Sequence, residues 1–133
     1  MAGTKTPTRA TSLLASQHTT QERVGRAEAL LQSARAFIYQ AAGEVEAALQ
    51  TGKEIPEEVS TTARLAAAHA AHSAAKAVDL MFTAAGGTAV YTTSRLDRCF
   101  RDVHMVTQHI AVAPSNIEMA GQYYLGLGYQ ERR

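Results

Sequence analysis

The sequence predicts an all-α protein, an up-and-down four-helix bundle. Two long stretches repeat apolar residues every three or four positions, and residues that begin or end helices flank both of them. No window alternates apolar and polar residues for long enough to predict a strand. With 133 residues the chain has the length of one domain. We therefore expect one bundle over residues 19–128, between tails at 1–18 and 129–133.

The first long helix is predicted to begin at Thr19 and to end at Gly52. Thr19 and Glu22 have the spacing of a capping box, in which side chains satisfy the free amides of a helix start. Apolar residues then form one stripe, and they are Val24, Ala27, Leu31, Ala34, Ile38, Ala41, Val45 and Ala48. Because such a helix is about 50 Å long, it needs a partner of similar length.

The second long helix is predicted to begin at Pro56 and to end at the pair Gly86 and Gly87. Proline suits the first turn of a helix, and the two glutamates that follow it suit the positive end of the helix dipole. The short connection predicts that this helix packs antiparallel to the first. Its stripe consists mainly of alanines, which let helix axes approach closely, and we expect Ala70 and Ala74 to lie at a helix contact.

Two shorter helices are predicted to follow. Ser94 and Asp97 resemble a cap, and the third helix has an apolar stripe of Leu96, Phe100, Val103, Val106 and Ile110. Pro114 is expected to stop or kink that helix. Ser115 and Glu118 restart a fourth helix, which ends near Gly126 and Gly128.

Composition and charge exclude several classes of function. The formal net charge of +1, without a basic run, argues against binding to nucleic acid or to a membrane surface. No apolar run is long enough to predict a transmembrane helix. A single cysteine, Cys99, cannot form a disulfide within the chain, so a reducing, cytoplasmic location is expected.

The histidines and Cys99 are weak candidates for chemistry. His69 and His72 have a spacing that can ligate a metal, but the chain lacks the Glu-x-x-His pattern of bundle metal sites. His104 and His109 lie about 140° apart around a helix, so they cannot share one ion. No metal site is expected, and Cys99 is expected to lie in the core.

The polar residues near the third helix leave two interpretations open. Arg98, Asp102, Met105 and His109 form a line about 100° from the apolar stripe, which fits either a solvated face or the edge of a site. Gly86 and Gly87 fit either a helix C-cap or a backbone that a ligand approaches closely.

A family resemblance favours the functional interpretation. The stretches "AAGGTAVY", "LDRCFRDVHMVTQHI" and "YYLGLG" resemble the C-terminal helical domain of the acyl-CoA dehydrogenase superfamily, particularly its flavin-dependent monooxygenase branch. Upstream, "QERVGRAEALLQSARAFIYQAA" and "RLAAAHAAHSAAKAVDLMFTAAGG" are similar to the two long helices of that domain. The resemblance covers about residues 5 to 128.

The resemblance implies a flavin, FAD or FMN, as cofactor. In that family the glycine pair lies in a loop that approaches the flavin of a neighbouring subunit, which implies cofactor contacts for Gly86, Gly87 and Thr88, together with Arg101. A histidine in this region of the oxygenase branch stabilises or protonates the flavin–oxygen intermediate, which implies a catalytic role for His109.

This sequence departs from the family pattern at several positions. Nine residues after Arg101, where many acyl-CoA dehydrogenases place a catalytic glutamate, stands Ile110. Thr83 and Ala89 replace a glutamine and a glycine that often accompany the glycine pair. The resemblance therefore does not extend to the dinucleotide contacts or to the catalytic base of the dehydrogenases, whereas His109 suits an oxygenase.

The resemblance implies a module of a larger enzyme. Family members are nearly three times as long, and their N-terminal helical domain and β-barrel hold most of the flavin and the substrate. We expect this chain to complete the flavin site and the oligomer core, as a dimer or tetramer, when those domains are supplied. The alternative is a non-catalytic helical protein that oligomerises or binds a partner.

Overall fold

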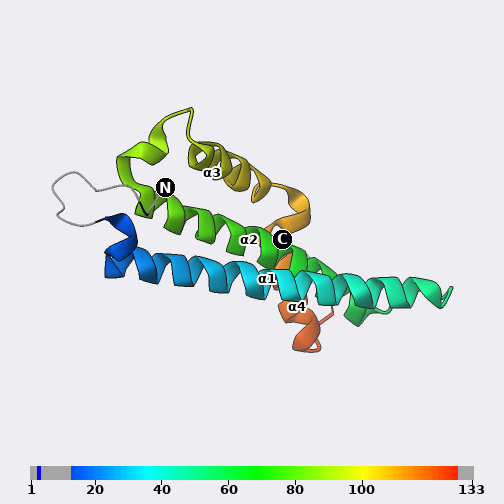
Figure 1. Ribbon diagram of the computed structural model, residues 1–133. Coiled ribbons are helices and arrows are strands. Elements are labelled where there is room, and N and C mark those ends of the chain that lie inside the picture. The colour runs from blue at the N-terminus through cyan, green and yellow to red at the C-terminus, as the bar shows by residue number, and fades with distance from the viewer. Residues whose placement is uncertain (1–2, 4–12, 129–133) are drawn as a thin grey trace.

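The computed structural model describes residue 3 and residues 13–128, and within them it contains helices and turns but no strand. The helices are α1 (His18–Gln50), α2 (Glu57–Ala85), α3 (Arg95–Val106) and α4 (Pro114–Tyr124) (Figure 1). Three short 3₁₀ turns accompany them, η1 (Leu14–Ser16), η2 (Gly86–Val90) and η3 (Ile110–Val112). The predicted all-α class with four helices is confirmed. The predicted tails at 1–18 and 129–133 fall largely outside the described residues.

Helices α1 and α2 form the predicted antiparallel hairpin (Figure 1). Gly52 has a φ of 67°, a left-handed conformation that glycine adopts without strain, and it turns the chain after α1. Every seventh residue of α1 is a buried alanine, at positions 27, 34, 41 and 48. Small side chains in this row let the two helix axes approach closely, so the hairpin is held by close packing.

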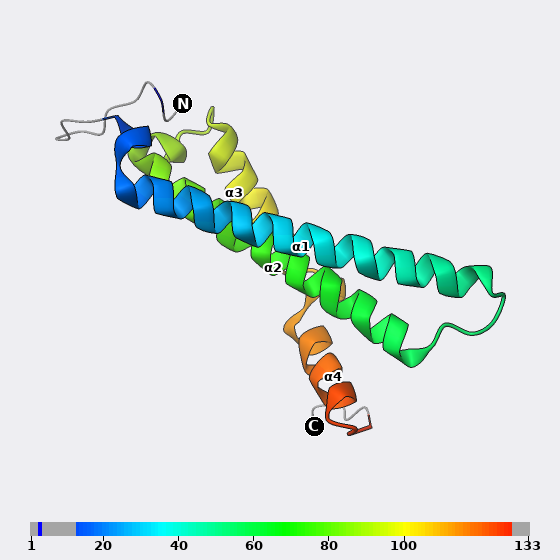
Figure 2. The same ribbon diagram turned by 60° about the horizontal axis from the view of Figure 1, so that its bottom comes forward.

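Helix α2 is the centre of the fold. It contacts α1 along its length, and both α3 and α4 pack extensively against it. Helix α4 leaves the hairpin at an oblique angle (Figure 2). Three neighbours explain why α2 buries residues around its circumference, namely Ala66, Ala68, Ser73, Ala75 and Ala77. Ala70 and Ala74, predicted at a helix contact, are half-buried.

Three predicted helix ends are wrong. Helix α1 begins at His18 after Gln17, which makes no side-chain cap, so Thr19 lies inside the helix and the predicted capping box is not formed. Helix α3 ends at Val106, well before Pro114, because the chain turns through η3 before α4 starts. Helix α4 begins at Pro114 after Ala113 and has no side-chain cap, so Ser115 lies inside the helix and does not start it. Other predicted ends are confirmed, since the Ser94 hydroxyl accepts a bond from the Leu96 amide at 3.2 Å and Gly86 follows the last residue of α2.

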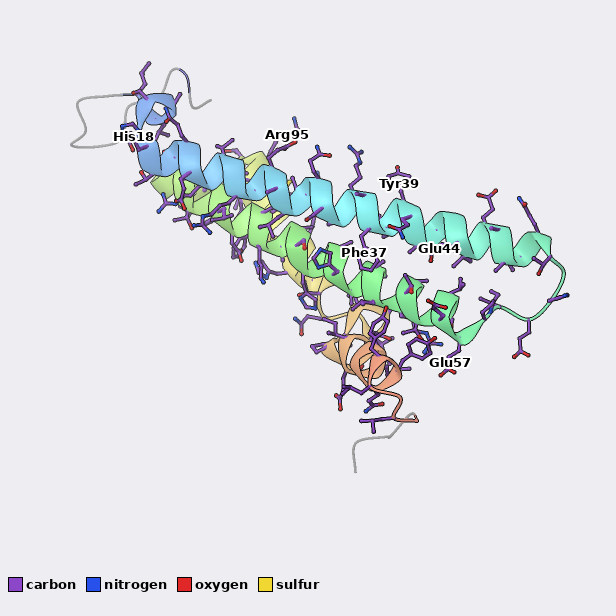
Figure 3. All side chains as sticks on the ribbon, turned by 90° about the horizontal axis from the view of Figure 1, so that it is seen from below. His18, Phe37, Tyr39, Glu44, Glu57 and Arg95 are labelled. Atoms are coloured by element: carbon purple, nitrogen blue, oxygen red, sulfur yellow. The ribbon has the colours of Figure 1, made fainter. Side chains whose placement is uncertain are left out.

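The predicted stripe of α1 is only half buried. Val24, Leu31 and Ile38 are 49 %, 45 % and 38 % exposed, because within the described residues α2 is the main helix packed along α1. The contact covers the alanine row and leaves the row beside it open. Figure 3 shows the same division at the middle of α1, where Phe37 points toward α2 and Tyr39 points away from it.

Helix α3 is attached to α2 by an aromatic and polar cluster, and none of its residues is fully buried. Phe82 of α2 and Phe100 of α3 have ring centroids 4.6 Å apart, and Phe100 lies 4.5 Å from the ring of His104. His104 Nε2 and Asp79 Oδ1 are 2.8 Å apart, a hydrogen bond between the two helices. The prediction of Cys99 as a core residue is wrong, because it lies off this face and is exposed.

The predicted α3 stripe is exposed at its C-terminal end, at Val106 and Ile110. They come where α3 ends and η3 begins, so the stripe loses its helical register there. None of the described helices is both long enough and apolar enough to cross a membrane.

Candidate functional site

The glycine pair forms an open turn at the end of α2. Gly86 has a φ of 61°, so a side chain there would strain the backbone, whereas Gly87 has no such restriction. A Cβ atom built on either glycine would have no atom within 4 Å. The Thr88 hydroxyl donates to the Ala85 carbonyl at 3.1 Å, which holds the turn. Both glycines therefore present bare backbone to open space.

Arg101 lies on the exposed side of α3. Its Nη2 atom is 2.8 Å from Asp97 Oδ2 one helical turn earlier, although the angles at this ion pair do not make a hydrogen bond. Asp97 is largely buried, while the guanidinium stays mostly exposed. The second pair on this helix, Arg98 and Asp102, is looser at 3.8 Å and lies in solvent. Arg101 is thus an oriented cation with donors left on its exposed side.

His109 occupies the residue before η3 and is exposed. Its Nδ1 atom accepts a hydrogen bond from the Ala111 amide at 3.1 Å. Because Nδ1 accepts, the neutral ring carries its proton on Nε2. The backbone of the turn therefore orients the imidazole and selects its tautomer, and no pattern in the sequence predicts this contact.

The structure places the glycine turn and His109 far apart within one chain. Val112, three residues after His109, contacts His72 of α2. From His72 to Gly86 at the end of α2, the rise of an α-helix gives roughly 20 Å. Arg101 lies on the helix that runs between these two places. The glycine turn and His109 can meet one ligand only if it is long or if other parts of the assembly contribute.

Among the cavities of the described residues, two lie along the hairpin, and none of the predicted site residues lines either of them. The first, of about 780 Å³, is an open groove between α1 and α2 with Leu30, Lys76 and Leu80 among its walls. The second, of about 450 Å³, shares Leu30 and Lys76 and reaches Pro114 at the start of α4. Both are mainly apolar.

His69 and His72, considered above as metal ligands, have other contacts. His69 Nε2 lies 3.4 Å from the Ser73 hydroxyl, and His72 Nε2 lies 3.2 Å from the Val112 carbonyl. Over the residues that the structure describes, no three His, Cys, Asp or Glu side chains gather where they could hold a metal ion.

The helical hairpin with α3 and α4 packed on α2 defines the class of protein to which this chain belongs, an all-α helical domain. The family model described as "Acyl-CoA dehydrogenase, C-terminal domain" matches residues 1–114. The chain belongs to this family. The family resemblance inferred from the glycine turn and the α3 motif is confirmed.

Curated relatives and a solved structure fall in the oxygenase branch. The chain is 34 % identical to the indole-3-acetate monooxygenase of Pseudomonas putida over 85 % of its own length, and 34 % identical to that of Acinetobacter baumannii over 87 %. It spans 29 % and 30 % of those two proteins. The crystal structure of 3-HSA hydroxylase from Rhodococcus sp. RHA1 superimposes with a TM-score of 0.80 and 25 % identity, and the match covers 87 % of this chain and 31 % of that one.

The chain is thus an acyl-CoA dehydrogenase C-terminal domain whose named relatives are monooxygenases and a hydroxylase. It corresponds to less than a third of each of these longer proteins. In extent it is a C-terminal module, as expected from the sequence.

Proposed function

We propose that this chain is the C-terminal module of a flavin-dependent monooxygenase, in which the N-terminal helical domain and the β-barrel are supplied in cis or in trans. The observation that carries the proposal is the 34 % identity to two monooxygenases over most of this chain but less than a third of theirs. The domain boundaries at residues 19 and 128 belong to the same proposal.

The glycine turn and Arg101 fit an anionic cofactor. Bare backbone at Gly86 and Gly87 lets a phosphate or ring approach closely, because no Cβ occupies the open space beside them. Arg101 has exposed N–H donors of the kind that bind phosphate oxygens. We assign Gly86, Gly87, Thr88 and Arg101 to contacts with FAD or FMN, and the flavin would supply the redox chemistry with dioxygen.

The distance between the glycine turn and His109 supports a site shared between chains. Roughly 20 Å along α2 separates the glycine turn from His109. The two places in one chain would therefore contact different flavins, or different parts of one extended cofactor. In this arrangement the glycine turn contacts the flavin of a neighbouring subunit, and His109 lies near the reacting groups.

His109 is proposed as the catalytic residue. Because its Nδ1 atom accepts from the Ala111 amide, the neutral ring has one N–H to offer, at the exposed Nε2 atom. That N–H can donate a hydrogen bond to the reacting group and stabilise negative charge that develops there. Since the relatives are named for indole-3-acetate, we infer an aromatic substrate for the assembled enzyme.

An exposed apolar row on α1 supports self-association of the chain. Val24, Leu31 and Ile38 form an exposed row at seven-residue spacing on α1, an apolar surface that a second helix can cover. We propose a dimer or tetramer built on such surfaces, in the cytoplasm. The same row also favours the alternative of a protein that only oligomerises or binds a helical partner.

The test joins this chain to the remainder of the Pseudomonas putida indole-3-acetate monooxygenase, in place of the region that it matches. Flavin retained after gel filtration and oxygen uptake dependent on indole-3-acetate are measured. We expect the purified chain alone to be colourless and to self-associate, and the hybrid to retain flavin. His109→Ala in the hybrid should lower oxygenation more than flavin binding, whereas His18→Ala, at the first residue of α1, serves as the matched control.

A folded hybrid that retains no flavin would contradict the proposal and favour the oligomerisation protein. A chain that holds flavin tightly by itself would show a complete site and would contradict the modular reading. Sedimentation of the chain as a monomer at micromolar concentration would remove the role in the oligomer core.

A further inference from the structure

His72 makes an interhelical contact that the proposed function does not use. From the middle of α2, its Nε2 atom meets the Val112 carbonyl at 3.2 Å, across 40 residues of sequence. The contact is half-buried, and a carbonyl oxygen can only accept, so the imidazole donates. It ties α2 to the turn that follows His109.

The backbone of the same residue, Val112, is also hydrogen-bonded to the backbone of His109. The Val112 amide donates to the His109 carbonyl at 3.0 Å, while the Val112 carbonyl accepts from His72. Between them, the Ala111 amide donates to the His109 ring at 3.1 Å. The clamp on Val112 and the bond that selects the His109 tautomer therefore lie within one short turn.

A second brace comes from α4. The Asn116 side-chain amide donates to the Ile110 carbonyl at 3.0 Å and, more weakly, to the Ala113 carbonyl at 3.4 Å. Asn116 follows the turn closely in sequence, so it shapes the turn locally. His72 belongs to a different helix and fixes the turn in space.

We propose that His72 is a positioning residue for His109: by clamping Val112 to α2, it holds the turn in which the Ala111 amide bonds to the His109 ring. The catalytic meaning of this role rests on the proposed function, whereas the effect on the His109 ring is a property of this chain alone. The role requires a donor at position 72. Both the neutral ring with its proton on Nε2 and the imidazolium supply one, so the clamp persists when His72 is protonated.

His69 provides a matched control on the same helix. It lies nearly one turn before His72, its Nε2 atom faces the Ser73 hydroxyl, and its ring lies 6.0 Å from that of Phe37 on α1. Loss of the His69 imidazole therefore removes a half-buried ring of the same size without removing a contact to the turn.

The experiment uses nitrogen-15 NMR of the full chain to read the tautomers of His72 and His109, together with hydrogen exchange of the Ala111 amide. The variants are His72→Leu, His72→Gln, His72→Glu and His69→Leu. Glutamine and glutamate have the same shape, but only glutamine can donate to Val112. In the wild type, neutral His72 and His109 should both carry their protons on Nε2.

We expect His72→Leu and His72→Glu to speed exchange of the Ala111 amide on the order of tenfold, as loss of one hydrogen bond implies, and to mix the two His109 tautomers. His72→Gln should stay within about twofold of the wild type by the same reasoning, and His69→Leu should leave both signals unchanged.

Two results would overturn the proposal. One concerns the variants. The proposal fails if a folded His72→Glu or His72→Leu chain keeps the wild-type His109 tautomer and the wild-type exchange rate of the Ala111 amide. It fails equally if His69→Leu alters both signals as much as His72→Leu does. The other is a wild-type His72 whose neutral ring carries its proton on Nδ1. Such a ring has no donor for the Val112 carbonyl, so this result contradicts the proposal even if the variants unfold. None of these signals needs flavin, so their failure is separate from failure of the hybrid enzyme. In a hybrid that turns over, His72→Leu should lower kcat with little change in KM, and His72→Gln should restore it.

Discussion

Overpacking the alanine row between α1 and α2 is the most direct test of the hairpin. Ala41 of α1 is 2 % exposed, and equal rise from the turn on both helices places it level with Ala66, which is 0 % exposed. At this low exposure, neighbouring atoms surround the methyl group of Ala41. Ala41→Leu adds three carbon atoms at this contact and must push the helices apart.

The expected loss of unfolding free energy is about 1 to 3 kcal/mol, the range for inserting methylenes into a packed core. For a chain of this size the melting temperature should fall by roughly 3 to 5 °C for each kcal/mol. Ala42→Leu is the matched control, because Ala42 is the next residue of the same helix and is exposed, and its effect should stay within about 0.5 kcal/mol.

Urea unfolding followed by far-ultraviolet circular dichroism measures both variants at one protein concentration. Equal midpoints and equal slopes for Ala41→Leu and Ala42→Leu would refute close packing at the alanine row. A lowered midpoint for Ala42→Leu alone would place the interhelical contact on the other face of α1.

Three further outcomes are expected. Gly86→Ala should destabilise the chain by about 1 to 2 kcal/mol because of its positive φ, whereas Gly87→Ala should leave chain stability unchanged and weaken flavin retention in the hybrid; equal effects on stability would contradict this division. A double-mutant cycle on Asp79 and His104 should give a coupling of about 0.2 to 1 kcal/mol, since both side chains are nearly half exposed, and zero coupling would show that α3 is held by its rings alone. Desolvation, then Glu58 and Glu57, raises the pKa of Tyr123, so its stabilising effect is present below about pH 10 and is lost as pH rises through the folded pKa. Ultraviolet titration should show a lower pKa of Tyr123 in Glu58→Gln. An unchanged pKa would exclude Glu58 as a cause of the shift.

Much of the fold follows from periodicity and from helix-ending residues. Gly52 and Gly86 end α1 and α2 as predicted, because a positive φ just after a helix strongly favours glycine. Periodicity could not say how much of the α1 stripe is covered, since burial depends on how many helices pack along it. Val24 and Leu31 therefore fit the pattern of a core but lie exposed.

The site was predictable only in part. The resemblance in sequence assigned roles to Gly86, Arg101 and His109, and these assignments stay predictions. The contacts that orient His109 could not be predicted, because they join its ring to a nearby backbone amide and tie its turn to His72, and no residue pattern marks such bonds. The pair of Asp79 and His104 was missed for the same reason, since it joins two helices through single side chains.

The attachment of α3 has a consequence for how the chain moves. Its two ends are anchored separately, by the end of α2 on one side and by the clamped turn at Val112 on the other, while its middle has no fully buried residue. We expect such a segment to open locally without unfolding the hairpin, with loss of its contacts to α2, among them those of Phe100 and His104. The amides around Arg101 should then exchange early, and a ligand bound there would slow the exchange of α3.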